Sequence, residues 1–259
     1  MRISLIQMDI AFGNPEANYS AAESKIREAA AEAPDCILLP ELWNTGYDLT
    51  RLKDIADIDG VLTKTLISSL AKEYGINIVA GSISKMNHDG VTNSMLAFNR
   101  QGELVGDYSK LHLFGLMDEH LYLQPGHTKG QFTLDEIPSA GVICYDIRFP
   151  EWIRVHMTDG AEILFVCAEW PLQRLSHWRA LLISRAIENQ CYVVACNRAG
   201  TDPANTFAGH SMIIDPWGEI VCEASDSEEI ISGELDLNNV RMVRQQIPIF
   251  LDRRPHLYL

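Results

Sequence analysis

The sequence contains no long hydrophobic run, no cysteine pair at CxxC spacing and no block of positive charge. A membrane-spanning helix needs roughly 18 consecutive apolar residues, and no run in the chain approaches this length. The chain starts with Met1-Arg-Ile-Ser-Leu-Ile, which leads into a strand-like pattern and the acidic Asp9 rather than a signal peptide. We therefore expect a cytoplasmic protein without a membrane partner.

Positive charge is scarce. The chain has 21 Lys and Arg against 35 Asp and Glu, which gives a net charge of −14 at pH 7. Nucleic-acid binding requires clustered Lys and Arg to neutralise phosphates, and an anionic membrane surface attracts the same residues. The charge therefore excludes a nucleic-acid surface and favours solubility, but it carries no information about the fold.

The cysteine pattern favours free thiols. No His lies at metal-finger spacing from a cysteine, so we expect no metal site. Four of the six cysteines lie in or beside apolar runs that are typical of core strands. A reduced intracellular protein with buried thiols fits this pattern better than a disulfide framework. The six are Cys36, Cys144, Cys167, Cys191, Cys196 and Cys222.

Apolar strand patterns and helical patterns alternate along the 259 residues, without a linker or low-complexity segment. This alternation predicts an α/β fold in a single domain spanning 1–259, in which hairpins add antiparallel strands. The expected helices are 15–33, 63–74, 151–158 and 176–189. The expected strands are 2–8, 36–39, 76–83, 92–99, 103–108, 132–134, 140–144, 163–166, 192–197, 209–214, 219–223 and 229–235. A long loop is expected at 115–130 and an irregular tail at 247–259.

The stretch Gly141–Trp152, GVICYDIRFPEW, combines a short apolar strand, a cysteine, a charged turn and a helix that opens at Pro150-Glu151. This order is typical of a nucleophile elbow, in which the side chain at the strand end projects beside the amide donors of the next turn. Cys144 is then a nucleophile. A buried structural thiol is the alternative, because free cysteine is among the most buried residue types.

Two further polar residues, Glu41 and Lys110, follow apolar strands. A thiol needs a base to become nucleophilic at neutral pH, and a carboxylate can take that proton and later return it to a leaving amine. A lysine ammonium can stabilise the oxyanion of a tetrahedral intermediate. The three residues are therefore complementary, although Glu41 taken alone is also consistent with a solvated loop carboxylate.

Five segments that appear in a fixed order resemble the nitrilase, or carbon–nitrogen hydrolase, superfamily over nearly the whole chain. They are LLPELWNTGY around Glu41, YSKLHLF around Lys110, GVICYDIRFPE around Cys144, HWRALLISRAIENQCYVVACN at 177–197 and GHSMIIDPWGEI at 209–220. Any one of these matches is modest evidence, whereas the ordered set is specific.

The resemblance implies a four-layer α-β-β-α sandwich of two stacked mixed β-sheets flanked by helices. It implies that Glu41 is the general base, Lys110 the oxyanion-stabilising cation and Cys144 the nucleophile that forms a thioester, without metal or organic cofactor. Glu119 matches the second glutamate of the superfamily, which orients the lysine and the substrate nitrogen; an exposed loop acid is the alternative. The backbone N–H of Tyr145 is expected to bind the oxyanion.

The substrate pocket is less well specified. Tyr47, Phe114, Glu169 and Trp170 are expected at its mouth, although Trp170 also suits a core position. Arg148 can bind a substrate carboxylate, but pairing with Glu151 or another buried carboxylate is the favoured interpretation. The last pair of interest, Arg185 and Glu188, lies three residues apart and predicts an ion pair on a helix surface.

Within the superfamily, Tyr145-Asp146 after the cysteine favours an amide over a nitrile substrate. The chain is most similar to bacterial ω-amidases, which implies hydrolysis of 2-oxoglutaramate, or a related ω-amide of a dicarboxylate, to the oxo acid and ammonia. A deaminated-glutathione amidase and an N-carbamoyl amidohydrolase with the same triad remain alternatives, as does a non-catalytic interaction protein. The superfamily also implies a homodimer.

Overall fold

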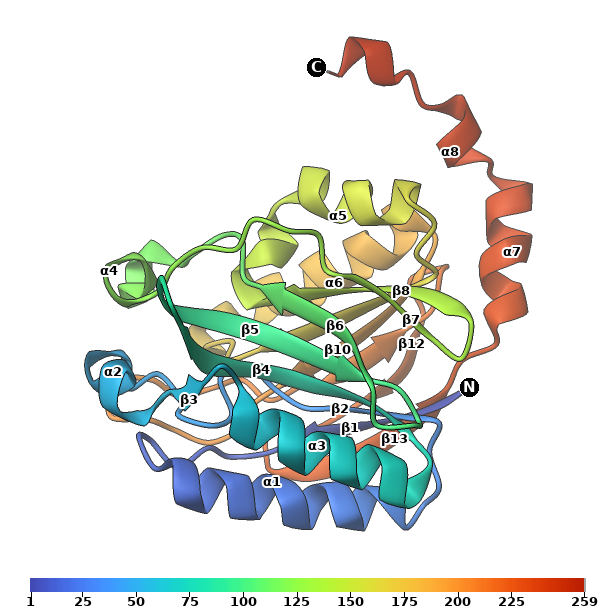
Figure 1. Ribbon diagram of the computed structural model, residues 1–259. Coiled ribbons are helices and arrows are strands. Elements are labelled where there is room, and N and C mark those ends of the chain that lie inside the picture. Colours follow the sequence, from blue (N-terminus) through green and yellow to red (C-terminus); the bar gives the residue numbers. More distant parts are fainter. Residues whose placement is uncertain (259) are drawn as a thin grey trace.

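The computed structural model describes residues 1–258, and within them the strands form two mixed sheets that stack face to face (Figure 1). The first sheet has seven strands in the order β13-β1-β2-β4-β5-β6, with β3 paired to β4. Its strands are β1 (Arg2–Gln7), β2 (Cys36–Leu38), β3 (Asp57–Ile58), β4 (Asn77–Asn87), β5 (Gly90–Phe98), β6 (Leu104–Ser109) and β13 (Glu229–Glu234).

The second sheet has, within the same residues, six strands in the order β12-β11-β10-β9-β8-β7. In each sheet the central strands are parallel and the strands at both ends of the order are antiparallel, whereas the short β3 pairs with β4 in parallel. The strands are β7 (Gln131–Leu134), β8 (Ile137–Ile143), β9 (Ile163–Ala168), β10 (Tyr192–Asn197), β11 (Met212–Ile214) and β12 (Ile220–Glu223).

Helices cover the outer face of each sheet, so that the layers follow the order α-β-β-α (Figure 1). The helices α1 (Pro15–Ala30) and α3 (Val61–Tyr74) cover the first sheet, and α5 (Pro150–Thr158) and α6 (Leu175–Asn189) cover the second. The fold class expected from the sequence is confirmed. None of the helices within residues 1–258 is long and apolar enough to cross a membrane.

Local sequence explains where these helices begin and end. The side chain of Asn14 accepts a hydrogen bond from the backbone of Ala17 at the start of α1, and Pro15 occupies the first helical position. At the end of α3, Gly75 adopts a left-handed conformation with φ of 64°, which glycine reaches without steric cost.

The two sheets bury one another because their facing side chains are apolar. Leu5 and Val79 of the first sheet share a core cluster with Val142, Phe165 and Val194 of the second. A second cluster lies between the first sheet and its helices. Each fully buried side chain of this size contributes about 1.5–3 kcal/mol to folding, so these clusters fix the relation between the layers.

Short helices and the C-terminal segment differ from the sequence prediction. The expected loop at 115–130 contains η2 (Gly115–Met117) and α4 (Glu119–Tyr122). The prediction of an irregular tail at 247–259 was wrong for the residues of α8 and η5, while Leu259 lies outside the described residues. The remaining elements are η1 (Leu49–Arg51), α2 (Leu52–Ile55), η3 (Cys144–Arg148), η4 (Leu172–Arg174), α7 (Leu237–Gln246), α8 (Ile249–Asp252) and η5 (Pro255–Leu257).

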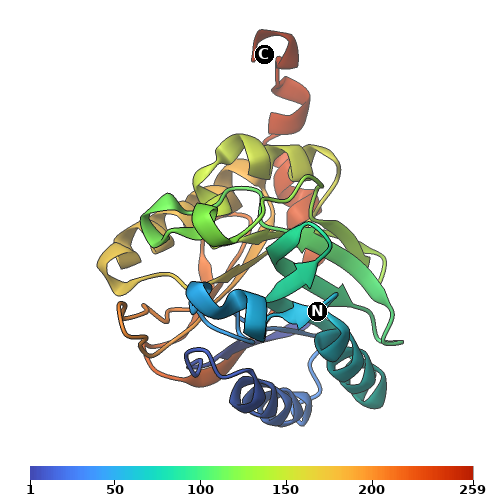
Figure 2. The ribbon, with the colours of Figure 1, turned by 60° about the vertical axis from the view of Figure 1, so that its left-hand side comes forward.

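The helix α7 packs along the body, with Val240 in the main core cluster. The short helices α8 and η5 extend away from the layered body in both orientations (Figure 1, Figure 2). The helix α7 is not among the helices expected from the sequence. Its side chains Val240 and Val243 are buried, whereas Met242 is exposed. Three or four apolar positions on one face are too few to identify such a helix from periodicity alone.

Candidate active site

Cys144 is the first residue after β8 and opens η3, which leads into α5 at Pro150. The backbone of Cys144 has a φ of 46°, in the left-handed region that non-glycine residues seldom adopt. Such a conformation costs on the order of 1–3 kcal/mol and persists only where the surroundings hold it. The sharp turn expected from the sequence is therefore present, and its strain falls on the thiol-bearing residue.

The side chain of Asp146 stabilises this turn through hydrogen bonds. Its carboxylate accepts hydrogen bonds from the backbone N–H of Ile143 at 3.0 Å and from the hydroxyl of Tyr108 at 2.8 Å. It also accepts the backbone N–H of His112 at 3.0 Å. Asp146 is fully buried, so these donors tie the elbow to the strand before it and to the segment that follows Lys110.

Arg185 supports the same turn from α6. Its Nε donates to the carbonyl of Ile147 at 2.8 Å, and its terminal nitrogen donates to Glu188 at 2.8 Å. The predicted ion pair is therefore present, but its expected position on a helix surface was wrong because Arg185 is buried. Helical spacing identifies a pair of neighbours and cannot indicate which face of the helix packs against the elbow.

Glu41 follows β2 and is fully buried. Its Oε1 accepts hydrogen bonds from Asn93 at 2.7 Å and from Lys110 at 2.8 Å. Its Oε2 accepts the backbone N–H of Glu169 at 2.8 Å, which joins the ends of β2 and β9 across the two sheets. The strand ends that the sequence places far apart thus meet at one edge of the sandwich, where α/β folds bind ligands.

Lys110 follows β6 and places its ammonium group between Glu41 and Glu119. The distance from Nζ to Oε1 of Glu119 is 2.6 Å, and all three side chains are buried. The second oxygen of Glu119 accepts the backbone N–H of Phe114 at 2.8 Å. Glu119 therefore lies on α4 inside the site and is not an exposed loop acid.

The charges in this cluster shift the pKa values of its members. Burial and the negative charge of Glu41 raise the pKa of the Cys144 thiol well above its ordinary value. Desolvation opposes the charged form of Lys110, but Glu119 and Glu41 outweigh it and raise the pKa of the ammonium well above its ordinary value. The resting site accordingly holds a neutral thiol beside a charged lysine.

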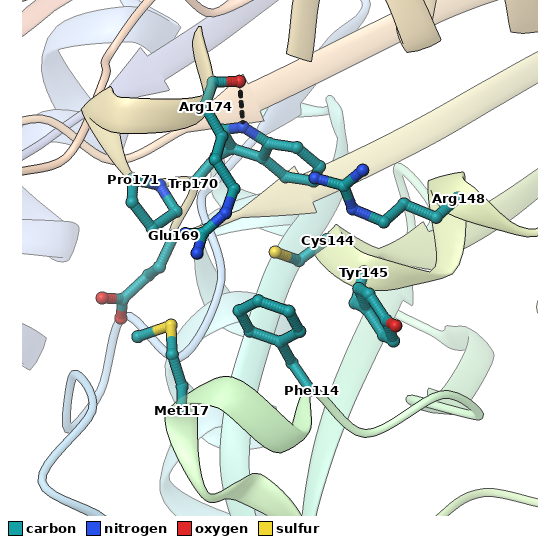
Figure 3. Close-up of a pocket in the computed structure, with 9 residues that line it drawn as sticks. All are labelled: Phe114, Met117, Cys144, Tyr145, Arg148, Glu169, Trp170, Pro171 and Arg174. Carbon is teal, nitrogen blue, oxygen red and sulfur yellow. Dashed lines mark hydrogen bonds between the residues drawn. The ribbon is translucent and has the colours of Figure 1, made fainter. Parts of the chain in front are cut away.

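The thiol of Cys144 opens into a pocket between aromatic side chains (Figure 3). Phe114 and Trp170 lie on either side of the sulfur in this view, and Tyr145 packs against Phe114 with 4.7 Å between ring centroids. The lining residues are Phe114, Met117, Cys144, Tyr145, Arg148, Glu169, Trp170, Pro171 and Arg174.

Tyr47 lies deeper than the sequence suggests. Its hydroxyl donates to Oε1 of Glu119 at 2.5 Å and lies 3.3 Å from Oε1 of Glu41. The side chain does not line the pocket beside Cys144 but contacts the carboxylates. Trp170 lines the pocket, as expected from the sequence. It also packs on the buried Trp178 with 5.4 Å between ring centroids, so it contributes to the core as well.

Arg148 makes no ion pair with Glu151 or any other carboxylate among residues 1–258. Its guanidinium lies 4.8 Å from the ring centroid of Trp170, and one nitrogen is 3.3 Å from Nδ1 of His177. The favoured interpretation of Arg148 as half of a structural ion pair was therefore wrong. The guanidinium faces the pocket instead.

Arg174 is not among the residues predicted from the sequence, and its guanidinium lies 5.6 Å from the ring centroid of Phe114 on the same pocket. It follows the strand-end loop Glu169-Trp170-Pro171, and this position was the signal available for it. Asn93, which holds Glu41, lies within a strand and offers no comparable signal. No cluster of metal-ligating side chains occurs among the described residues.

Comparison with known proteins now identifies the chain. Residues 2–245 match the carbon–nitrogen hydrolase family model. The chain belongs to the carbon–nitrogen hydrolase family. It is 51% identical over 256 residues to 2-oxoglutaramate amidase of Bacillus subtilis, with 99% of this chain and 98% of that protein covered.

The chain is also similar to more distant members of the carbon–nitrogen hydrolase family. The human ω-amidase NIT2 is 34% identical, with 99% of this chain and 96% of that protein covered. The crystal structure of XC1258 from Xanthomonas campestris, a carbon–nitrogen hydrolase superfamily protein, superimposes with a TM-score of 0.91 at 28% identity, covering 98% of this chain and 97% of that one. The protein is a hydrolase that acts on carbon–nitrogen bonds other than peptide bonds.

Proposed function

We propose that this enzyme hydrolyses the terminal amide of a small dicarboxylate ω-amide, 2-oxoglutaramate, to 2-oxoglutarate and ammonia. The observation that carries the proposal is one pocket in which the thiol of Cys144 faces the guanidinium groups of Arg148 and Arg174. Neither guanidinium has a carboxylate partner among residues 1–258. An arginine pair of this kind binds the free carboxylate of a substrate whose other end lies at the thiol. The identity to the Bacillus subtilis enzyme supports the same substrate.

The first half of the proposed reaction acylates the cysteine. Glu41 takes the thiol proton of Cys144 as the sulfur attacks the amide carbon. Lys110 and the backbone N–H of Tyr145 stabilise the negative charge that develops on the carbonyl oxygen. The intermediate collapses to a thioester when Glu41 returns the proton to the nitrogen, which leaves as ammonia.

The second half restores the enzyme. Glu41 takes a proton from a water molecule, which attacks the thioester carbon, and Lys110 again stabilises the oxyanion. The carbon–sulfur bond breaks, the acid is released, and the proton on Glu41 returns to Cys144. Glu119 and Tyr47 hold Lys110 and Glu41 in place throughout. One amide and one water are consumed, and one acid and one ammonia are formed.

The decisive experiment uses Cys144→Ala as the control and measures ammonia release from 2-oxoglutaramate and from an N-carbamoyl amino acid. For deaminated glutathione, whose amide nitrogen leaves as the amine of cysteinylglycine, it measures release of that dipeptide. We expect release from 2-oxoglutaramate by the wild type and none by the variant. Carbon dioxide together with ammonia from the carbamoyl compound alone would identify a carbamoylase instead. A wild type as inactive as Cys144→Ala on all three substrates would favour a non-catalytic role.

We further propose that the enzyme is a homodimer in a reducing, cytoplasmic compartment. The C-terminal segment exposes Leu251, Leu257 and Tyr258, which a second copy would cover. All six cysteines are free, and five of them are buried. Sedimentation equilibrium tests the dimer, and a chain ending at residue 246 should shift towards the monomer if this segment forms the contact.

A further inference from the structure

Glu169 carries a carboxyl oxygen that no group in the described residues satisfies. The residue follows β9, is fully buried and lines the pocket beside Cys144. Its Oε2 accepts a hydrogen bond from Arg198 at 2.8 Å, whereas its Oε1 has no hydrogen-bond partner. Buried polar atoms are nearly always paired, so an unpaired oxygen in a substrate pocket points to a ligand.

The position of this carboxyl group is fixed by its surroundings. Arg198 is fully buried, donates to Asp9 at 2.8 Å and to the carbonyl of Ile10 at 3.0 Å, and lies 4.1 Å from the ring centroid of Phe207. The backbone N–H of Glu169 is held by Glu41. Neither end of the residue is free to turn its Oε1 towards another protein group.

The other polar groups of the proposed substrate already have partners. In the proposed mechanism the amide oxygen accepts hydrogen bonds from Lys110 and from the backbone N–H of Tyr145, and the amide nitrogen contacts Glu41 and Glu119. The substrate carboxylate binds Arg148 and Arg174. On a 2-oxo ω-amide only the 2-oxo oxygen is left, and it is a hydrogen-bond acceptor that requires a donor.

Glu169 is able to donate. Burial raises the pKa of its carboxyl group to about 8, with Glu41 and Asp202 acting in the same direction and Arg198 in the opposite one. The raised pKa makes the protonated carboxyl accessible near neutral pH. Because Arg198 donates to Oε2, the proton resides on Oε1.

We propose, on the basis of the function given above, that Glu169 is a specificity-determining residue whose Oε1–H donates a hydrogen bond to the 2-oxo oxygen of the ω-amide. The pocket therefore selects 2-oxo acids over the same chain with CH2 at that carbon. It also disfavours a 2-ammonium group, which is a donor and meets another donor.

The test uses three amides of equal chain length that differ only at carbon 2: 2-oxoglutaramate, glutaramate and L-glutamine. Values of kcat/KM are measured for the wild type, Glu169→Gln and Glu169→Leu, with the exposed Glu73→Gln as the matched control. Glu169→Leu leaves the buried Arg198 with Asp9 as its remaining carboxylate partner, so some loss on every substrate is expected. We therefore expect Glu169→Leu to lower the ratio of kcat/KM for 2-oxoglutaramate to kcat/KM for glutaramate at least tenfold. Activity on glutaramate also reports that the variant is folded.

Glu169→Gln should retain most of the preference for the 2-oxo substrate. Its carbonyl oxygen can accept from Arg198 while its NH2 group donates into the pocket. Equal losses on 2-oxoglutaramate and glutaramate in Glu169→Leu would assign the residue a structural role and overturn the inference. A wild-type preference for L-glutamine over glutaramate that Glu169→Leu abolishes would also overturn it, because Glu169 would then act as an ionised acceptor.

The design separates this inference from the proposed function. If the wild type hydrolyses 2-oxoglutaramate but Glu169→Leu keeps its ratio of substrate preference, only the role of Glu169 fails. If the wild type releases ammonia from none of the three amides, both fail.

Discussion

The ammonium nitrogen of Lys110 lies 2.8 Å from Oε1 of Glu41 and 2.6 Å from Oε1 of Glu119, with all three side chains buried. One positive charge therefore faces two carboxylates in a region without solvent. Burial and this arrangement together keep the thiol of Cys144 neutral at rest, since a thiolate would add another negative charge to the buried cluster. In the proposed mechanism the sulfur becomes nucleophilic as its proton passes to Glu41.

Replacing Lys110 with Met should destabilise the protein as well as inactivate it. The substitution leaves two buried carboxylates without a counter-charge, and removal of one partner from a buried pair costs about 3–5 kcal/mol. Urea unfolding and ammonia release measure the two effects. The matched control is Lys129→Met, which breaks an exposed pair with Asp159 and should change stability by less than about 1 kcal/mol. Equal unfolding midpoints for both variants would contradict the electrostatic account.

Glu41→Gln should make Cys144 easier to ionise while making the enzyme slower. The negative charge of Glu41 raises the pKa of the thiol, so its removal lowers that pKa and moves iodoacetamide alkylation to lower pH. Loss of the base should reduce ammonia release by at least about 100-fold. Alkylation of Cys144→Ala supplies the background from the other cysteines. The assigned base role would be contradicted by a Glu41→Gln variant that acylates at the wild-type rate.

The alkaline side of the pH profile should report the raised pKa of the Cys144 thiol. Because burial and the charge of Glu41 raise that pKa, the thiol keeps its proton as the pH rises past about 8.5, the ordinary thiol value. With glutaramate as substrate, we expect kcat to stay level through that pH. A decline in kcat centred near 8.5 would show that the thiol is unshifted.

Arg148→Met and Arg174→Met should each raise KM for 2-oxoglutaramate by about 10–100-fold, because a hydrogen bond to a charged group contributes about 1.5–3 kcal/mol. A neutral amide such as butyramide lacks the carboxylate and should be hydrolysed by wild type and variants with similar kcat/KM. The control is Arg27→Met, which removes an exposed guanidinium on α1. If both arginine variants lost activity on butyramide and 2-oxoglutaramate alike, they would support the elbow rather than the substrate.

Features that depend on a few neighbouring residues could be predicted from the sequence, whereas contacts between distant segments could not. Strand ends, the break before the short apolar strand at Cys36 and the turn after Cys144 follow from apolar runs, proline and glycine, which act over a few residues. The ordered motifs around Glu41, Lys110 and Cys144 also follow from the sequence and indicated the family. The helix α7 was missed because its apolar face is small.

The contacts that these motifs make with distant residues depend on tertiary packing and could not be predicted from the sequence. The approach of Arg174 to Phe114, the contact of Tyr47 with the carboxylates and the burial of Arg185 beneath the elbow join residues from separate elements. A charged side chain gives no signal in the sequence of whether it will meet a partner of opposite charge or face a pocket. Arg148 illustrates this, because Glu151 lies three residues away in the sequence but forms no ion pair with it.

By itself the sequence determined the α/β class and which residues are the candidate thiol, base and cation, because hydrophobic periodicity and residue chemistry are local properties. Only the tertiary structure decided that the free oxygen of Glu169 and the guanidiniums of Arg148 and Arg174 belong to the same pocket as Cys144. The reason is physical: whether a polar atom is paired or unpaired depends on which distant segments the stacked sheets bring beside it.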